Sequence, residues 1–449
     1  MGGVRDAAVV TEAAIGSPVN GSSGGSTAGR TLFLAIAAVA CIAGYVYVYA
    51  SGRETAPIRS DAFSYYVYLP SWALYHDLSL QAVADDCCGG TFPEWSAITR
   101  WPRTHRWVDA HPIGEAVLIA PFFAVAHLLT KWTNLPPNGF SFYYQHAAGL
   151  AGLSYVLVGL WFLHRLLSRY FTSGIVVAAL ATLLAGTSLY HYATYDSAWS
   201  HAFSFALCSA LFERLDAWNP PRRSNDVAIG LIAGLLFLVR HTNIAIPICL
   251  LAAMWLPGAV PGDARSKRRL TITAAVTAAI VIAPQLWLYK LSTRHWLVSA
   301  YGTLGFTFTD PHFWGVLFSP RKGLFFYAPV LLLALGGLAI LPQGLSRWRL
   351  PTLVILTVHT YLIACWWDWQ FGGSYGHRGF VDIYPLLAPG MAAVFARITA
   401  RPVMRGVVGA AVVLLCALSI FQMLQYWHGV LPISDVTWRQ YRALFLRTW

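Results

Sequence analysis

Asp61 is the acidic residue whose neighbours most strongly suggest chemistry. Three tyrosines, which can line a boundary between water and an apolar phase, follow it within the segment 59–70. A carboxylate in such a place can take a proton from a hydroxyl group as a general base. The alternative is structural, because Ser60 or Asp61 could cap the helix that follows.

A second polar cluster occupies residues 190–201, which hold one acid, two histidines and four aromatic residues. Asp196 and His201 are candidates for binding an acceptor, and Asp196 facing Asp61 could hold a divalent cation. The alternative is an aromatic belt at a membrane interface with incidental polar groups.

Arg240 and His241 separate two apolar runs, 228–240 and 244–257, that are short for full membrane crossings. We therefore expect the Arg240 guanidinium to lie within the depth of the membrane, where charged groups are costly and are usually functional or paired. Its planar fork suits phosphate oxygens. The alternative is snorkelling to the interface.

Several further cations are candidates for binding the same anion. In the segment 366–382, glycines allow close backbone approach, and tryptophans can either stack on a sugar or anchor in the membrane interface. Together with two preceding loops, this segment supplies Lys290, Arg321, Lys322, His377 and Arg378.

The composition indicates an integral membrane protein. Of 449 residues, 57% are hydrophobic and 11% are charged, and the mean hydropathy is +0.54; soluble domains carry about 25% charged residues. Soluble multidomain enzymes, nucleic-acid binders and disordered scaffolds are therefore excluded, and the net charge of +12 is better explained by loop orientation. P-loop, GxGxxG, HExxH and GxSxG motifs are missing.

The seven cysteines do not form a disulfide framework. Five lie in apolar runs, and the adjacent pair Cys87-Cys88 lacks the spacing of a zinc site. We predict neither a metal site nor a cofactor.

The hydrophobic pattern predicts an all-α polytopic protein with about eleven transmembrane helices. The predicted spans are 31–50, 143–163, 173–189, 201–218, 228–240, 244–257, 270–291, 323–341, 351–366, 383–397 and 404–427. The apolar segment 112–130 is interpreted as a half-inserted helix within the first loop; a twelve-span alternative in which it crosses would put the basic loops on the wrong side.

Basic residues in short loops set the orientation. Thirteen Lys and Arg residues fall on one side, which we assign to the cytoplasm, in the loops 164–172, 219–226, 258–269, 342–350 and 397–405. The N-terminus is then cytoplasmic, and the multi-pass protein lies in the inner or plasma membrane. Loops 51–142, 190–200, 292–322 and 367–382 face outward.

Three parts are predicted along the chain. Residues 1–30, rich in Gly and Ser, form a disordered cytoplasmic tail. Residues 31–427 form the transmembrane domain, whose long first outer loop (51–142) contains juxtamembrane helices. Residues 428–449 are a short outer tail.

This arrangement resembles the GT-C superfamily of membrane glycosyltransferases, which use lipid-linked sugars and include the protein O-mannosyltransferases and bacterial aminoarabinose transferases. The resemblance rests on Asp61 after the first span, the Asp196 loop, the bend 238–243 and the long loop after the seventh span, and covers about residues 31–322. The chain departs from the family in having a lone Asp61 where many members carry an acidic pair.

The resemblance implies that a polyprenyl-phosphate sugar is the donor and that a glycan, a lipid or a protein is the acceptor. It implies an inverting transfer on the extracytoplasmic side, with Asp61 as general base and the cations stabilising the leaving phosphate. Two alternatives stay open: a transporter or flippase of a lipid-linked or anionic substrate, and a glycan ligase or polymerase that uses a lipid diphosphate. Nucleic acid is not an expected partner.

Overall fold

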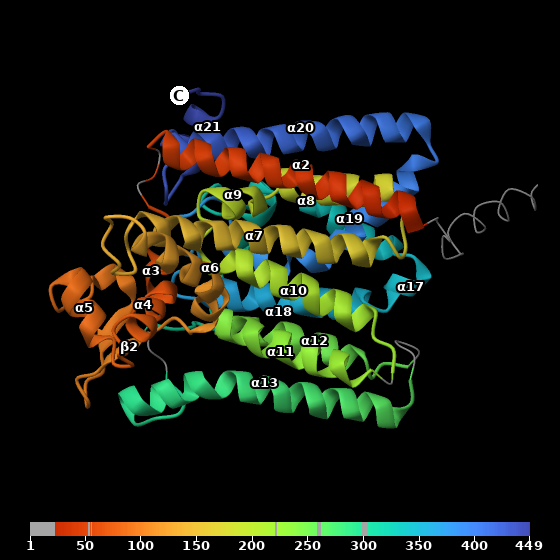
Figure 1. Cartoon of the computed structure of the whole chain (residues 1–449). Coiled ribbons are helices and arrows are strands. Elements are labelled where there is room, and N and C mark those ends of the chain that lie inside the picture. The colour runs from red at the N-terminus through yellow and green to blue at the C-terminus, as the bar shows by residue number, and fades with distance from the viewer. Residues whose placement is uncertain (1–22, 53, 55, 221, 258–261, 299–303) are drawn as a thin grey trace, which may run out of the picture.

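The computed structural model describes residues 23–52, 54, 56–220, 222–257, 262–298 and 304–449. Long helices run side by side, and short helices and loops gather at one end of the bundle, at the left of Figure 1; we call this the loop end. The elements are α2 (Ser23–Ala50), α3 (Asp61–Tyr66), α4 (Tyr68–Ala73), α5 (Gln81–Cys88), η1 (Glu94–Ser96), β1 (Ile98–Arg100), β2 (Trp107–Asp109), α6 (Gly114–Lys131), α7 (Phe142–Leu167), α8 (Ser173–Ala185), α9 (Leu189–Thr194), α10 (Ser200–Asp216), α11 (Arg223–Val239), η2 (His241–Ile244), α12 (Ala245–Ala253), α13 (Ala264–Thr293), α14 (Phe313–Phe318), α15 (Leu324–Tyr327), α16 (Val330–Gly337), η3 (Leu338–Ile340), α17 (Gln343–Ser346), α18 (Arg349–Cys365), η4 (Arg378–Ile383), α19 (Tyr384–Thr399), α20 (Pro402–Trp427) and α21 (Trp438–Leu444).

The predicted all-α polytopic fold is confirmed. Each of the eleven predicted spans coincides with a helix or a run of short helices, with ends that shift by a few residues. Within the described residues, seven helices are long and apolar enough to cross a membrane, and three shorter apolar helices accompany them. Helix α2 begins at Ser23, so the last part of the predicted tail is helical; residues 1–22 lie outside the described part of the chain.

Helix α6 is the apolar segment that the sequence placed within the first loop. Its 18 residues are sufficient for a crossing by length and composition. The Tyr155 hydroxyl, in the middle of α7, donates to the carbonyl of Leu118 (3.3 Å), near the start of α6. Leu129, near the end of α6, lines a groove together with Phe142 at the start of α7. Helix α6 therefore starts inside the bundle and ends at the loop end.

Helix α10 forms the centre of the bundle. All its residues except Arg214 are buried, and many of them are Ser, Ala or Phe. A Cβ atom on Gly152 of α7 would lie 1.6 Å from the Ser197 carbonyl oxygen, so only glycine permits this approach. A small residue here lets α7 pack closely against the turn that precedes α10.

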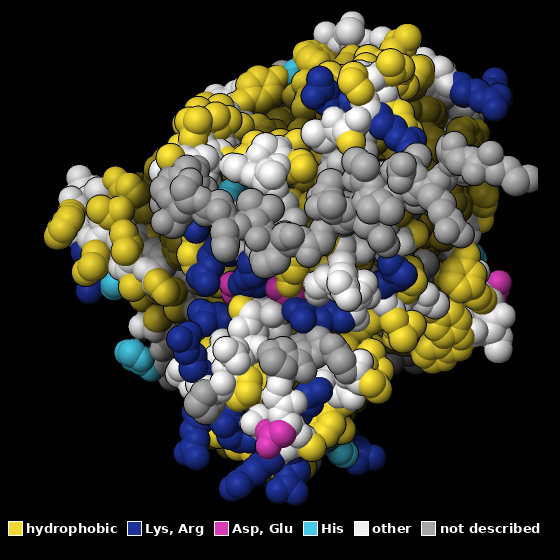
Figure 2. Space-filling model, turned by 90° about the vertical axis from the view of Figure 1, so that its right-hand side faces the viewer, with side chains coloured by type: hydrophobic (Ala, Val, Ile, Leu, Met, Phe, Trp, Pro, Cys, Tyr) yellow, Lys and Arg dark blue, Asp and Glu magenta, His cyan; other side chains and the backbone are white. Residues whose placement is uncertain are grey.

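The end of the bundle opposite the loop end is closed by a buried ionic cluster. Asp216, at the end of α10, accepts from Arg169 (2.8 Å), Arg347 (2.7 Å) and Trp348 (2.7 Å). Lys and Arg side chains are spread over this face of the molecule (Figure 2). The predicted basic loops thus share one end of the bundle. There, Arg169 and Arg347 neutralise the buried carboxylate of Asp216.

The first loop folds into short helices, and it also contains the antiparallel hairpin β1–β2. The sequence predicted helices in this loop but not the hairpin. Cys87 and Cys88, the one cysteine pair outside the apolar runs, form a vicinal disulfide within α5. The tail after α20 packs onto the bundle: the Gln422 side chain donates to the hydroxyl of Tyr441 in α21 (2.6 Å).

Gly390 provides a test of this packing. A Cβ atom there would lie 2.0 Å from the carbonyl oxygen of Ala334, where α19 crosses α16. We expect Gly390→Ala to lower the melting temperature in detergent by several degrees, because the helices must separate. The control Gly409→Ala, with nothing within 4 Å of its Cβ, should leave the melting temperature unchanged or slightly higher. Equal melting temperatures for the two variants would contradict the packing.

Candidate active site

A cavity of about 460 Å³ at the loop end brings together residues that lie far apart in the sequence. We call it the Asp61 cavity. Its polar walls hold three of the predicted cations together with the predicted acid, and its apolar walls are largely aromatic. Among its lining residues are Asp61, Tyr65, His111, Arg240, His241, Thr242, Tyr289, Phe306, His359, Trp366, Trp367, Asp368, Phe371 and Arg378.

Asp61 is the first residue of α3, and its carboxylate is turned toward Arg378. The Arg378 Nη1 atom lies 2.9 Å from Asp61 Oδ2. The preceding Ser60 has a φ of 49°, uncommon for a residue other than glycine, and makes no side-chain capping bond. The capping alternative is therefore not what this turn shows. Burial raises the pKa of Asp61, but the charge of Arg378, helped by His111 and Arg240, brings the pKa below its ordinary value.

The Arg378 guanidinium lies over two aromatic rings. Its guanidinium carbon lies 4.5 Å from the ring centroid of Trp199 and 5.7 Å from that of Phe371. Contact with the ring faces fixes the plane of the guanidinium and leaves its N–H edge for hydrogen bonding. One edge meets Asp61, so the others can serve a ligand.

Arg240 occupies the predicted break between two helices. Helix α11 ends at Val239, Arg240 is extended, and η2 begins at His241. The Arg240 Nε atom lies 3.2 Å from Asp382 Oδ2, and its guanidinium lies 5.6 Å from the ring centroid of Phe371. The other Asp382 oxygen is 2.9 Å from His201 Nδ1. The snorkelling alternative fails, because Arg240 is held by a buried carboxylate.

His201 is therefore a supporting residue. It is buried and does not line the cavity, and its Nε2 atom lies 3.4 Å from Arg240 Nη1. His241 does line the cavity, with its ring against Phe237 at 4.7 Å.

Several residues of this site escaped the sequence analysis. Asp382 and Asp368 lie in the marked segment 366–382, but only its cations were chosen. His111 and the buried Glu115 flank the start of α6, and no motif distinguishes them. Glu115 is close enough to Asp61 and Arg240 for their charges to act on it, and among the described residues its two carboxylate oxygens have no hydrogen-bond partner.

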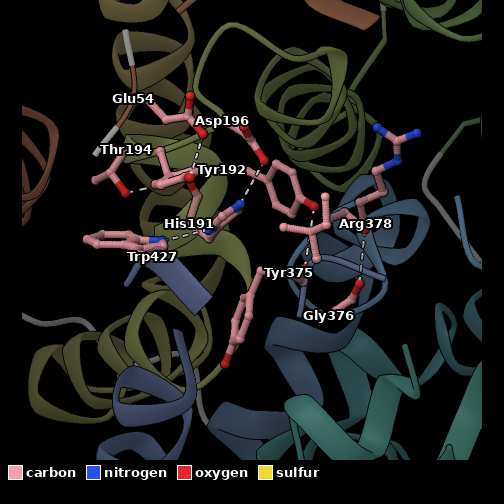
Figure 3. Close-up of polar contacts among 12 residues, drawn as sticks. Glu54, His191, Tyr192, Thr194, Asp196, Tyr375, Gly376, Arg378 and Trp427 are labelled. Atoms are coloured by element: carbon pink, nitrogen blue, oxygen red, sulfur yellow. Dashed lines mark hydrogen bonds and ion pairs between the residues drawn. The ribbon is translucent and has the colours of Figure 1, made fainter. Parts of the chain in front are cut away.

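Asp196 lies in a different, buried network beside the cavity. It pairs with Arg59 (2.7 Å) and with His191 Nε2 (2.8 Å), while the Trp427 indole donates to His191 Nδ1 (2.9 Å). Since an indole N–H can only donate, His191 Nε2 carries the proton donated to Asp196. Figure 3 shows the contacts that join Asp196, His191 and Trp427; the Arg378 side chain extends away from them. Asp61 and Asp196 are thus each paired with different cationic side chains, Arg378 for the former and Arg59 for the latter.

Four predicted ligand-binding cations do not line the Asp61 cavity. Lys290 donates to the carbonyl of Arg294 (2.8 Å), and Arg321 pairs with Asp435 (3.3 Å). These contacts hold loop and tail segments at the surface. The predicted binding roles of Lys290 and Arg321 are therefore not supported.

Lys322 and His377 are buried and serve the backbone. The Lys322 ammonium donates to the carbonyls of Ser374 and Ile433, which ties the C-terminal tail to the loop before η4. A ring nitrogen of His377 lies 2.8 Å from the carbonyl of Trp369. In the sequence these residues look like cations that could bind a ligand. In the structure their side chains instead contact backbone carbonyl groups of irregular segments.

Comparison with known proteins identifies the fold. No model of a protein family and no curated protein sequence matches the chain. Among solved structures, it is similar to ArnT from Cupriavidus metallidurans in the apo state, an aminoarabinose transferase of the GT-C type. The TM-score is 0.54 and the sequence identity 13%; the match covers 88% of this chain and 64% of that one. The fold is therefore shared, as the sequence resemblance predicted.

Lys322 predicts a dependence of stability on pH. Burial lowers its pKa from 10.5 to about 7, so between about pH 7 and 10 the unfolded chain binds more protons and stability rises with pH. From pH 7 to 9 we expect a gain of about 2 kcal/mol, seen as a rising melting temperature that is absent from Lys322→Gln. The same pH slope in the variant would show that Lys322 is not the source.

Proposed function

We propose that this protein is a glycosyltransferase that moves a sugar from a polyprenyl-phosphate donor to an acceptor hydroxyl, with Asp61 as general base. The observation that carries the proposal is the Asp61 cavity, where the Asp61 carboxylate lies beside two guanidinium groups in a fold shared with a sugar transferase. A base for the acceptor hydroxyl and cations for the leaving phosphate are the two kinds of group that a displacement from phosphate requires.

Arg240 and Arg378 are the proposed phosphate ligands. Each is oriented by one carboxylate, Asp382 or Asp61, and each lies near the Phe371 ring. A guanidinium has five N–H donors, so it can bind a phosphate oxygen while it also contacts a carboxylate. Preorganised cations stabilise the growing negative charge on the leaving phosphate more than the ground state, which lowers the barrier.

The reaction proceeds in one displacement. The acceptor oxygen attacks the anomeric carbon from the face opposite the phosphate while Asp61 takes the hydroxyl proton. The bond between the anomeric carbon and the phosphate oxygen breaks, and its electron pair stays on the lipid phosphate. The aromatic rim of the cavity, where Trp367 is 53% and Phe306 40% exposed, supports a role in receiving the sugar and the first lipid units.

The location follows from charge. The basic loops gather at the end opposite the cavity, so if that end is cytoplasmic the cavity opens on the extracytoplasmic face. The lipid bilayer and a lipid-linked sugar are then the proposed partners, and the acceptor is a glycan, a lipid or a protein. A transporter or a ligase acting on a lipid diphosphate would use the same cations without needing Asp61 as a base.

Substitution of Asp61 tests whether its carboxylate is the general base. We expect Asp61→Asn to lower kcat by about 10²- to 10⁴-fold, because the amide cannot accept the proton. Release of undecaprenyl phosphate from a panel of undecaprenyl-phosphate sugars (glucose, mannose, arabinose and aminoarabinose) gives the rate, with an extract of the producing cells as acceptor. The exposed Asp310→Asn serves as the matched control. Unchanged turnover in Asp61→Asn would reject Asp61 as the general base, whereas no transfer by the wild type with any donor of the panel would reject the proposed activity.

Substitution of Arg240 tests whether its guanidinium binds the lipid phosphate. We expect Arg240→Ala to weaken binding of undecaprenyl phosphate in nanodiscs by at least about 10-fold, and Arg240→Lys to weaken it less, because lysine keeps the charge and loses the fork. Arg439→Ala, at an exposed position, should bind like the wild type. A well-folded Arg240→Ala protein with wild-type affinity would assign the phosphate to other residues.

A further inference from the structure

Asp368 is a carboxylate of the Asp61 cavity that the proposed reaction does not use. It lines the cavity together with Asp61 and Arg378, and the charges of both residues act on it. Arg378 is paired with Asp61, and Arg240 is paired with Asp382, whereas Asp368 has no ion pair among the described residues. The cavity therefore presents one carboxylate that its own two arginines do not engage.

A tight turn holds Asp368 in place. Its backbone carbonyl accepts from the Phe371 N–H (2.9 Å), and its carboxylate accepts from the Gly372 N–H. Phe371 has a φ of 58°, which is uncommon for a residue other than glycine and is kept mainly where the surroundings require it, often at ligand sites. A carboxylate has about four acceptor positions, so the contact with Gly372 leaves others for a ligand.

The same turn also reaches the two proposed phosphate ligands. The Phe371 ring centroid lies 5.6 Å from the guanidinium carbon of Arg240 and 5.7 Å from that of Arg378. Directly before Asp368, Trp367 lines the cavity at its rim. Asp368 thus belongs to a short segment of cavity wall that leads from the rim to the phosphate ligands. The sugar of the donor is bonded to the phosphate, so it lies near this segment.

A carboxylate near a phosphate site weakens the binding of phosphate unless it serves another part of the ligand. Like charges repel more strongly in a cavity with aromatic walls than in water, because the effective dielectric constant is lower. Sugar hydroxyl groups are hydrogen-bond donors, and a carboxylate is the strongest acceptor among side chains. Arginines and an unpaired carboxylate in one cavity therefore suit a ligand that joins a phosphate to a sugar.

We infer that the Asp368 carboxylate binds ring hydroxyl groups of the donor sugar, and that it selects sugars in which these hydroxyls are free. This inference rests on the proposed function and concerns the part of the donor that the phosphate ligands do not hold. Asp368 orients the sugar by accepting hydrogen bonds, and it takes no proton and forms no covalent bond. A sugar without the hydroxyl leaves the carboxylate unsatisfied, so the site discriminates against it.

Donors with and without a sugar separate this role from a purely structural one. In full-length protein in nanodiscs, Asp368→Ala should lower kcat/KM at least about 10-fold for the undecaprenyl-phosphate sugar that the wild type uses. Its affinity for undecaprenyl phosphate alone should stay equal or rise, since a negative charge is removed. Asp368→Asn should lose less, because the amide oxygen still accepts. The exposed Asp310→Asn should match the wild type.

Monodeoxy derivatives of the same donor test the contact itself. We expect the wild type to use at least one derivative about 10-fold less efficiently than the parent sugar. Asp368→Ala should use that derivative and the parent about equally well, because the hydroxyl and the carboxylate act as a pair. A carboxylate that only completes its own turn would produce no such coupling.

Wild-type kcat/KM in a well-folded Asp368→Ala enzyme would overturn the inference, as would discrimination between parent and deoxy sugars that persists in this variant. An equal loss of affinity for undecaprenyl phosphate alone would also overturn it, because the effect would then lie at the phosphate. If Asp368→Ala does not fold, undiminished discrimination in Asp368→Asn decides against the inference. In contrast, the proposed function fails if the wild type transfers no sugar.

Discussion

Charge pairing inside an apolar bundle is the constraint on which this structure depends. Arg240 and Arg378 are costly in low-dielectric surroundings, and each is stabilised by one carboxylate. Removing either carboxylate leaves an uncompensated buried cation. The same pairing fixes each guanidinium in a defined orientation, so the groups that stabilise the fold also prearrange the cavity for an anion.

Irregular backbone places these charges. Asp61 begins a short helix of the first loop, Arg240 sits in the break between α11 and η2, and Arg378 begins η4 before α19. Unpaired backbone groups at membrane depth are tolerated where they are enclosed by protein or line a cavity. Gly114 shows how tightly the break is enclosed: a Cβ atom on it would lie 2.4 Å from the carbonyl carbon of Leu238.

The sequence predicted the parts of this structure that periodicity and charge control. The spans follow from apolar runs, and the break at Arg240 from two runs that are each too short. The predictions that Arg240 and Asp61 carry the chemistry stay predictions, but the cavity places both on its walls together with Arg378.

The rest depended on tertiary packing. Asp382 and His201 are recognised as partners of Arg240 only once α10 and η4 lie together, and a buried Lys322 looks in sequence like any exposed lysine. The sequence analysis identified the polar cluster that contains Asp196, but it could not show that Asp196 pairs with Arg59, which is far away in the sequence. Sequence patterns marked the segments, whereas the orientation of each side chain required coordinates.

The most direct test of the account is an experimental structure of the full chain in nanodiscs with bound undecaprenyl phosphate. We expect density for the phosphate in contact with Arg240 and Arg378, close to Asp61, and the lipid leaving past the aromatic rim at Trp366 and Trp367. Phosphate bound elsewhere on the protein, with these two guanidinium groups still engaged only by their carboxylates, would contradict it.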